Sequence, residues 1–481
     1  MAARVTPSRA FAALAISVAS LALLQNLVIP VIPLIQDDLG VTADAASWTM
    51  TAWLIAAAVA TPVLGRVGDL FGRKRTFLAV LVVVAIGDVV AALAPNLELL
   101  IAGRVLQGVG GALFPLAFGL MRDVMPPRRV TGAIGATSAI IGIGGAAGSV
   151  LAGPIAEAIG WRGLFVVPMV ISLVGILLTI ALIPRIATAA TGRINLLSAV
   201  LLSAWLVALL VPLSSGARWG WASPLTLGLF ALAALLLAAW AVWELHAREP
   251  LVDIRMLLDR AIWPTNAAGI LVGAAAFGFW GYLPQFLEVP GTTGYGLGLD
   301  AQAAGLVLVP LLVGMSAIGF TTGAISRVLP LRAQLSIGAG AMGVSVVAAV
   351  LFHTAVWQLA VAGGVFGLGI GLAYAAAASI IVQSVPGDRV GVATGMNANL
   401  RTIGSAVGSA LTAALVFGSV SGDAVPPEGG FDAAWITMAA LALAAAVLVA
   451  VVAPARDARD AASDADEREA AEEAVAIAEA A

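Results

Sequence analysis

Long apolar runs, separated by short clusters of charged residues, proline and glycine, recur along the whole chain. Each run holds about 20 mostly apolar residues, which is the length that an α-helix needs to cross a bilayer. The runs lack the alternation of apolar and polar positions over about ten residues that marks the strands of a membrane barrel. The pattern therefore predicts fourteen membrane-spanning helices, at residues 11–35, 45–64, 76–94, 97–121, 132–157, 164–183, 195–213, 222–243, 262–289, 302–325, 333–352, 357–382, 391–417 and 432–453.

Composition agrees with a membrane protein and narrows its chemistry. Apolar residues make up 61% of the chain and charged residues 11%, whereas a soluble domain has about 45–50% and about 25%. The chain has no cysteine and only two histidines, so a metal or catalytic site rich in these residues is not expected. No nucleophile–base constellation and no basic patch with interleaved aromatics is found. The sequence predicts an all-α integral membrane protein that is not an enzyme, holds no cofactor and binds no nucleic acid.

The distribution of lysine and arginine predicts the orientation. With both termini in the cytoplasm, all but four of the 24 basic residues fall on the cytoplasmic side. Arg162 and Arg218 then lie outside, and Arg104 and Arg401 lie within spans. Inner loops rich in Lys and Arg are the usual signature of orientation. We therefore expect a multi-pass protein of a cytoplasmic (inner) membrane with both termini inside.

An internal repeat predicts the domain organisation. A shift of 260 residues aligns Arg129-Val130 with Arg389-Val390 and Gly148-Ser149 with Gly408-Ser409. The fourth and fifth spans thus correspond to the twelfth and thirteenth, which indicates a repeated six-helix bundle with two inserted helices. The expected parts are a cytoplasmic N-terminus (1–10), a first six-helix bundle (11–183), two inserted helices (195–243), a cytoplasmic loop (244–261), a second six-helix bundle (262–453) and an acidic cytoplasmic tail (454–481).

The loop between the second and third predicted spans combines glycines with an acid and bases: Gly65, Gly68, Asp69, Gly72, Arg73 and Lys74. Glycines allow a tight turn, and Asp69 can lie at a helix N-terminus or pair with a basic residue. Such a contact forms a latch that breaks when two halves rock. The run resembles the Gly-x-x-x-Asp-x-x-Gly-Arg-Arg/Lys loop of the major facilitator superfamily.

The fourth span carries Arg104 and Gln107 in a run that resembles the Arg-x-x-Gln-Gly motif of the same family. A charge inside the membrane costs at least about 2.5–3.5 kcal/mol, so Arg104 must face water or a partner. Asp88 on the third span lies at a similar depth, and the two side chains are expected to be close enough to pair. Asp88 either has a function in transport, or it forms a static ion pair, or it is a hydrated acid that faces a neighbouring helix.

The fifth span has small residues near a four-residue spacing, which allows close helix approach. The stretch resembles the antiporter motif of drug exporters, but the usual Gly-Pro is replaced by Gly148-Ser149 and proline comes five residues later. This departure leaves the direction of transport open. The residues concerned are Gly144, Gly148, Ser149, Gly153 and Pro154.

Three further stretches resemble the fourteen-span drug:proton antiporter branch of the superfamily: residues 48–54, 249–260 and 397–404. The resemblance implies a secondary active transporter that exports small amphipathic compounds by proton antiport through alternating access. It implies protons, a small amphipathic substrate and membrane lipids as partners, and we expect a monomer.

Proton antiport needs a carboxylate that takes up and releases a proton. The branch commonly has an acid in the first span, where this chain has Gln25 and Asn26. The remaining candidates for coupling are Asp88, its neighbour Arg104, and Glu288 at the outer end of the ninth span. The candidates for the substrate cavity are Gln25, Asn26, Trp48, Trp53, Gln107, Tyr282, Gln285, Asn397, Asn399 and Arg401.

Asp88, Arg104 and Arg401 give the membrane interior a net positive charge, which favours neutral, zwitterionic or anionic amphipathic substrates. Two alternatives remain open at this stage. A lipid or glycolipid flippase of the same fold suits the missing first-span acid. A sensor or scaffold that does not transport would have no use for the Asp69 loop or for Arg104.

Overall fold

The computed structural model describes residues 6–28, 31–184, 193–417 and 425–452. These residues form helices joined by short loops, and fourteen helical segments are long and apolar enough to cross a membrane. The prediction of an all-α protein with fourteen spans is therefore confirmed. The expected acidic tail at 454–481 lies outside the described residues.

The helices follow one another in this order: α1 Pro7–Leu27, α2 Ile32–Leu39, α3 Ala43–Phe71, α4 Arg73–Ala92, α5 Leu97–Gly108, α6 Leu113–Val124, α7 Pro127–Ile159, α8 Gly163–Leu182, α9 Leu196–Trp219, α10 Pro224–His246, α11 Ile254–Leu257, α12 Trp263–Trp280, α13 Leu283–Glu288, α14 Ala301–Val307, α15 Val309–Ile325, α16 Leu331–Leu351, α17 Val356–Ser384, α18 Val390–Phe417 and α19 Glu428–Val452.

Several predicted spans are divided where proline or glycine interrupts them. The stretch predicted as one helix at 11–35 ends at Leu27, and a separate short helix α2 follows with proline in its first turn. The ninth span breaks into α12 and α13, and the tenth into α14 and α15, again with proline at the start of the second piece. Proline lacks the N–H that would continue the preceding helix and its ring clashes with the carbonyl one turn back.

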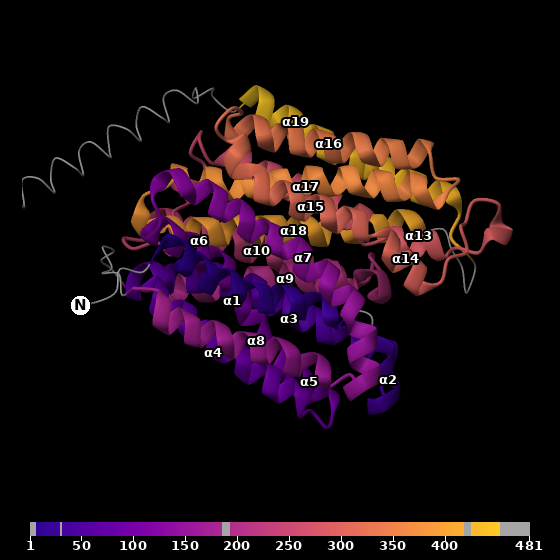
Figure 1. Cartoon of the computed structure of the whole chain (residues 1–481), viewed down its shortest axis with the longest axis horizontal. Helices are drawn as coiled ribbons and strands as arrows, with labels where there is room; N and C mark the ends of the chain where they lie inside the picture. The colour runs from indigo at the N-terminus through magenta and orange to yellow at the C-terminus, as the bar shows by residue number, and fades with distance from the viewer. Residues whose placement is uncertain (1–5, 29–30, 185–192, 418–424, 453–481) are drawn as a thin grey trace, which may run out of the picture.

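The helices form two groups that lie against each other (Figure 1). Helices α1–α8, drawn from indigo to magenta, contain one apolar core, and α12–α19, drawn from rose to yellow, share another. A third core joins the first group to α17 and α18 through Ile381, Val382 and Val390. The groups meet along two seams, α3 against α18 and α7 against α15. Adding 260 to the residue numbers of α3 gives the region of α15, and adding it to those of α7 gives the region of α18. In the repeat, the α3–α18 seam therefore corresponds to the α15–α7 seam. This is the arrangement that two parallel repeats require.

Glycines bring the backbones together at both seams. A Cβ added to Gly65 on α3 would lie 2.4 Å from the carbonyl oxygen of Gly391 on α18. One added to Gly135 on α7 would lie 2.5 Å from the carbonyl oxygen of Gly319 on α15. Side chains larger than hydrogen cannot fit there without separating the helices.

Helices α9 and α10, which separate the two groups in sequence, pack on the α3–α18 seam. Leu202, Trp205 and Leu206 of α9 share an apolar cluster with Trp240 of α10 and Val392 of α18. Helix α9 contacts both α3 and α18, and α10 packs against α9. The inserted pair therefore covers this seam from one side.

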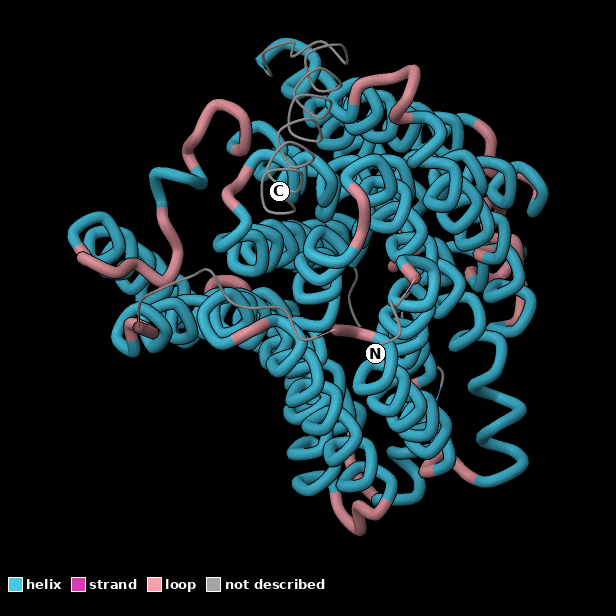
Figure 2. The backbone as a smooth tube through the Cα atoms, turned by 60° about the vertical axis from the view of Figure 1, so that its left-hand side comes forward, coloured by secondary structure: helices cyan, strands magenta, loops and turns pink. Residues whose placement is uncertain are grey.

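Dense clusters of lysine and arginine lie at one end of the molecule, which we call the basic end. It consists of residues 66–75, 122–129 and 387–389, and helix α1 begins at the same end (Figures 1 and 2). Gly72 turns the chain between α3 and α4 with a φ of 105°, a conformation that side chains other than glycine rarely adopt. Basic loops of this kind face the cytoplasm in most membrane proteins.

A histidine at the opposite end is expected to make stability depend on pH. His353 Nε2 lies 2.9 Å from Glu428 Oε1. Burial alone would lower the pKa of His353, but the hydrogen bonds to Glu428 and to backbone carbonyls raise it above its usual value. A raised pKa stabilises the fold below the unfolded value near 6.5, and this stabilisation is lost as the pH rises through the folded value.

We therefore expect His353→Gln to lower the free energy of unfolding by about 0.5 kcal/mol at mildly acidic pH and to have no effect at alkaline pH. Thermal melting of the purified protein at both pH values measures this difference. His246→Gln, which changes the only other histidine, is the control and should behave the same at both. Equal destabilisation by His353→Gln at acidic and alkaline pH would contradict the assignment.

Candidate functional site

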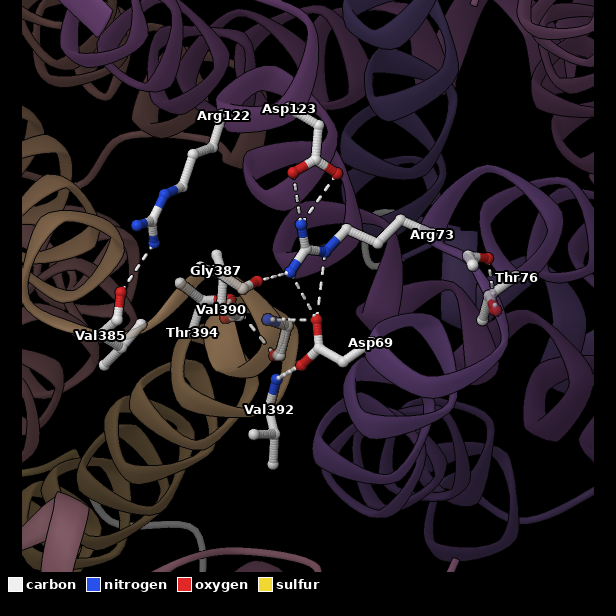
Figure 3. A network of polar contacts seen from close by, with 12 residues as sticks. Asp69, Arg73, Thr76, Arg122, Asp123, Val385, Gly387, Val390, Val392 and Thr394 are labelled. Atoms are coloured by element: carbon white, nitrogen blue, oxygen red, sulfur yellow. Dashed lines mark hydrogen bonds and ion pairs between the residues drawn. The ribbon is translucent and has the colours of Figure 1, made fainter. Parts of the chain in front are cut away.

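Asp69 joins the two helix groups at the basic end (Figure 3). Its carboxylate is buried near the end of α3 and accepts hydrogen bonds from the backbone N–H groups of Gly391, at 3.1 Å, and Val392, at 3.0 Å. These groups belong to the first turn of α18. A helix N-terminus has free N–H groups and a partial positive charge, so it binds a carboxylate well.

Arg73 lies beside Asp69 and extends the contact in two directions. Its guanidinium pairs with Asp69 Oδ1 at 2.7 Å and with both oxygens of Asp123, at 2.7 and 2.8 Å. The same group also donates to the carbonyl oxygen of Gly387, in the turn before α18. A planar guanidinium can satisfy several acceptors at once, which a lysine ammonium cannot do with fixed geometry. One arginine thus connects α3, α4, α6 and the second helix group.

Arg122 makes a second contact between the helix groups, with the end of α17, the helix that precedes α18. It donates to the carbonyl oxygens of Val382 and Val385, both at 2.8 Å, at the C-terminal end of α17. A helix C-terminus has free carbonyls and a partial negative charge, so it attracts a cation. The first helix group therefore places the carboxylate of Asp69 at the N-terminus of α18 and the guanidinium of Arg122 at the C-terminus of α17. We call the contacts of Asp69, Arg73 and Arg122 with residues 382–392 the latch.

Two glycines of this segment allow close packing against neighbouring helices. Gly65 faces Gly391 of α18 across the latch, whereas a Cβ on Gly68 would lie 2.3 Å from the side chain of Leu116 on α6, in the same helix group. Lys74 is directed elsewhere, because it donates to the carbonyl oxygens of Ile180 and Ile183 in its own helix group.

A second polar cluster lies inside the first helix group. Asp88 on α4 accepts a hydrogen bond from Gln107 Nε2 at 2.8 Å, and Gln107 Oε1 accepts one from Arg104 at 2.7 Å. All three side chains are fully buried. Arg104 also donates to the carbonyl oxygen of Thr49 on α3. The expected proximity of Asp88 and Arg104 is present, but Gln107 stands between them where a direct pair was expected.

One carboxylate oxygen of this cluster accepts no hydrogen bond from the described residues. Asp88 Oδ2 is buried and has no hydrogen-bond partner among the described residues. Trp53 covers the cluster from α3, with the Arg104 guanidinium 5.6 Å from its ring centre. A buried carboxylate oxygen without a partner is costly, whereas a protonated carboxyl at the same place carries no charge. The cluster can thus exist in two protonation states.

A small pocket lies between the two helix groups. Its walls include Phe114, Phe118 and Ser138 from the first group and Tyr374, Asn397 and Arg401 from the second. The Arg401 guanidinium lies 4.3 Å from the centre of the Tyr374 ring. Asn397 donates to Asn266 Oδ1 at 2.9 Å. The pocket therefore combines aromatic walls with one cation and a few polar groups, and in the described conformation it has room for only a water molecule or two.

The other predicted cavity residues are scattered. Tyr282 donates to the carbonyl oxygen of Ser409 at 3.0 Å, and Asn26 donates to Ala22 in its own helix. Asn399 is buried, with neither amide atom paired among the described residues. Gln285 and Glu288 are exposed, whereas Gln25 and Trp48 are partly buried. Exposure of Glu288 at the end of α13 speaks against its prediction as a coupling carboxylate, which needs a desolvated site.

The predicted packing motif on α7 divides into two parts. A Cβ on Gly144 would lie 2.5 Å from Ala22 of α1, and one on Gly148 would lie 2.9 Å from Leu23 and Asn26. Gly153 has nothing within 4 Å of such a Cβ, and Pro154 is exposed. Close packing against α1 is therefore a property of Gly144 and Gly148, and not of Gly153 and Pro154. The Ser149 side chain lies outside the described part of the chain.

Sequence reasoning missed three residues of these sites. Asp123 lies in the last turn of α6 beside Arg122, and an acid next to a basic residue is a signal that the sequence shows. Tyr374 is one of only three tyrosines in the chain, and Asn266 is a lone amide near the start of α12. Among the described residues, no group of three His, Cys, Asp or Glu side chains is placed to hold a metal ion.

Comparison with known proteins supplies the context of these sites. A sequence model of the Major Facilitator Superfamily matches residues 14–409 and 267–478. The tetracenomycin C resistance and export protein of Streptomyces glaucescens is 29% identical over 429 residues, which are 86% of this chain and 77% of that protein. Multidrug resistance protein 3 of Bacillus subtilis is 26% identical, over 80% of this chain and 74% of that one. An uncharacterized MFS-type transporter of Mycobacterium tuberculosis is 28% identical over 84% of this chain, which spans 59% of its length.

Two solved structures are similar in fold. The human organic anion transporter MFSD10 superposes with a TM-score of 0.66 at 14% identity, over 92% of this chain and 99% of that one. The proton:xylose symporter XylE superposes with a TM-score of 0.67 at 12% identity, over 94% and 97%. At these identities the likeness concerns the fold alone.

Proposed function

Because the chain belongs to the Major Facilitator Superfamily, whose members are transporters and not enzymes, we propose that it exports small amphipathic compounds across a cytoplasmic membrane in exchange for protons. A relative named as a tetracenomycin C resistance and export protein, and another named as a multidrug resistance protein, support the choice of substrate class and direction. The basic end is the cytoplasmic side in this proposal, because lysine and arginine gather there. Both termini then lie in the cytoplasm.

The observation that carries proton coupling is the buried cluster of Asp88, Gln107 and Arg104. Asp88 is 0% exposed, and its unpaired Oδ2 offers a place for a proton. Four residues separate it from the end of α4, which is about 6 Å along the helix axis. A proton from the far side of the membrane therefore needs to cross only a short distance to reach it. Asp88 is the proton carrier in this proposal.

In this proposal, protonation of Asp88 changes the hydrogen bonds of Gln107 and Arg104. With Asp88 ionised, the amide of Gln107 is oriented to donate to the carboxylate and to accept from Arg104. A proton on Asp88 removes the charge that holds this orientation and weakens both hydrogen bonds. Arg104 also donates to the carbonyl oxygen of Thr49 on α3, the helix that carries Asp69 near its other end. The proton-carrying cluster and the latch are therefore connected through one continuous helix.

Alternating access follows from the latch. The contacts of Asp69, Arg73 and Arg122 close the basic end in the described conformation. Opening that end breaks all of them together, because each one crosses between the two helix groups. Binding of substrate from the cytoplasm and loss of the proton from Asp88 belong to the state in which the latch is open. The closed latch belongs to the state that faces outward and takes up a proton.

Transport in proteoliposomes tests the proposal. Vesicles with an acidic lumen should accumulate a fluorescent amphipath when they contain the protein, and an ionophore that collapses the pH gradient should abolish the accumulation. Empty vesicles are the control for passive partitioning. Accumulation that ignores the gradient would refute proton antiport, and movement of labelled lipid in place of the amphipath would favour a flippase.

A further inference from the structure

Arg401 places a positive charge between the two helix groups near the middle of the membrane. It lies eleven residues into α18 from Val390 at the basic end, which corresponds to about 17 Å along a helix. The apolar part of a bilayer is about 30 Å thick, so this depth is close to its centre. The side chain contributes to the wall of the pocket described above.

The guanidinium of Arg401 is held by an aromatic ring. It lies 4.3 Å from the centre of the Tyr374 ring, and Tyr374 is buried on α17. An arginine over an aromatic face is attracted to the ring and keeps N–H groups that can donate to a ligand. The ring thus positions the cation without neutralising its charge.

The buried acids of the chain's described part have partners other than Arg401. Asp88 is bonded to Gln107, and Asp69 is paired with Arg73. The carboxylate of Glu244 on α10 accepts from the backbone N–H groups of Leu251 and Val252. Within the described residues Arg401 has no ion pair with a carboxylate. An uncompensated charge at this depth is costly unless water or a ligand offsets it.

From this geometry we propose, on the basis of the transport function proposed above, that the pocket, widened in the state in which the latch is open, binds aromatic amphipaths bearing an acidic group. The Arg401 guanidinium pairs with the carboxylate or phenolate of the substrate, and Phe114 and Phe118 contact its rings. A planar guanidinium binds a carboxylate through two parallel hydrogen bonds, and aromatic walls favour flat apolar rings. A neutral ester of the same compound loses the ionic contact and leaves the charge of Arg401 unpaired.

Binding of a matched pair of fluorescent probes to the purified protein in nanodiscs tests this inference. The probes are 3-hydroxy-2-naphthoate and its methyl ester, which share the aromatic rings and differ in the charge. The wild type is expected to bind the acid at least about tenfold more tightly than the ester, the ratio that a charge-assisted hydrogen-bonded pair supplies. Signals from empty nanodiscs are subtracted to remove partitioning into lipid.

Arg401→Gln is expected to bind both probes within about twofold of each other, because it removes the charge and keeps a polar side chain of similar length. Arg401→Lys should retain part of the preference, since it keeps the charge without the planar stack. Arg255→Gln removes an exposed arginine from the short helix α11 and should leave the ratio unchanged. Equal binding of acid and ester by the wild type, or an undiminished preference in Arg401→Gln, would overturn the inference.

The outcome is separable from that of the transport experiment, because binding is measured without a gradient. Gradient-driven accumulation of a neutral or cationic amphipath together with equal binding of the two naphthoates would leave the exporter standing and remove the acid site. Selective binding of the acid that depends on Arg401, without any response of transport to the gradient, would support the acid site and refute proton antiport.

Discussion

Asp69→Asn is expected to lower gradient-driven transport by at least about tenfold. The variant removes the charge that binds the N-terminus of α18 and pairs with Arg73, and it places an amide N–H₂ near two backbone N–H groups. The two hydrogen bonds to the first turn of α18 exist only in the closed conformation, and a hydrogen bond to a charged group contributes about 1.5–3 kcal/mol. Because about 1.4 kcal/mol corresponds to a factor of ten, losing both should make the conformation closed at the basic end at least about a hundredfold less populated. The transport cycle then stalls with that end open.

Asp123→Asn is the matched control, because Asp123 also pairs with Arg73 but lies in the same helix group. We expect it to reduce transport much less than Asp69→Asn. Spin labels on cysteines placed at Arg75 and Ser384, two exposed residues on opposite sides of the latch, report the opening as a distance distribution. The chain contains no cysteine of its own, so labelling is specific. Unchanged distances in Asp69→Asn, or equal transport defects in the two variants, would contradict the assignment of the latch.

Asp88→Asn is expected to abolish the dependence of transport on the pH gradient while downhill exchange of substrate continues. Asparagine keeps the hydrogen bond with Gln107 and fills the same space, but it cannot gain or lose a proton. The cluster is then fixed in a state that resembles the protonated one. Accumulation against a concentration gradient should fall to the level of passive equilibration, whereas exchange of labelled for unlabelled substrate should stay within about threefold of the wild type.

Glu288→Gln separates the two carboxylates that the sequence offers for coupling. Glu288 is exposed at the end of α13, and its substitution should leave gradient-driven accumulation intact. The same proteoliposomes serve for both variants, so protein content and passive leak are matched. Coupling that survives in Asp88→Asn and is lost in Glu288→Gln would reverse the assignment.

The sequence predicts the membrane spans well because apolar length is a local property. Fourteen runs correspond to the fourteen candidate spans of the structure, and the main errors lie where proline divides a run, as between α12 and α13. The parallel repeat is also visible in the sequence, and the correspondence of the two seams agrees with it. Helix ends and kinks depend on single prolines and glycines, which a hydropathy pattern averages out.

The candidate sites are less accessible to sequence reasoning because their partners carry no sequence signal. The spacing of the loop around Asp69 predicts a helix N-terminus or a basic residue as its partner, and the structure contains both. The particular helix was not predictable, since the partners are backbone groups of residues more than 300 positions away. The bridging of Asp88 and Arg104 by Gln107 is likewise a matter of side-chain orientation. Tyr374 acquires its role only because α17 and α18 bring it under Arg401.

Proton release on addition of substrate tests the central claim of proton antiport through Asp88 most directly. The purified protein in weakly buffered detergent solution is mixed with a pH-sensitive dye and then with saturating amphipath, and the change in dye signal is compared for the wild type and Asp88→Asn. We expect the wild type to release close to one proton per substrate bound and Asp88→Asn to release none while still binding. Substrate binding without proton release in the wild type, or equal release by Asp88→Asn, would contradict proton antiport through this residue.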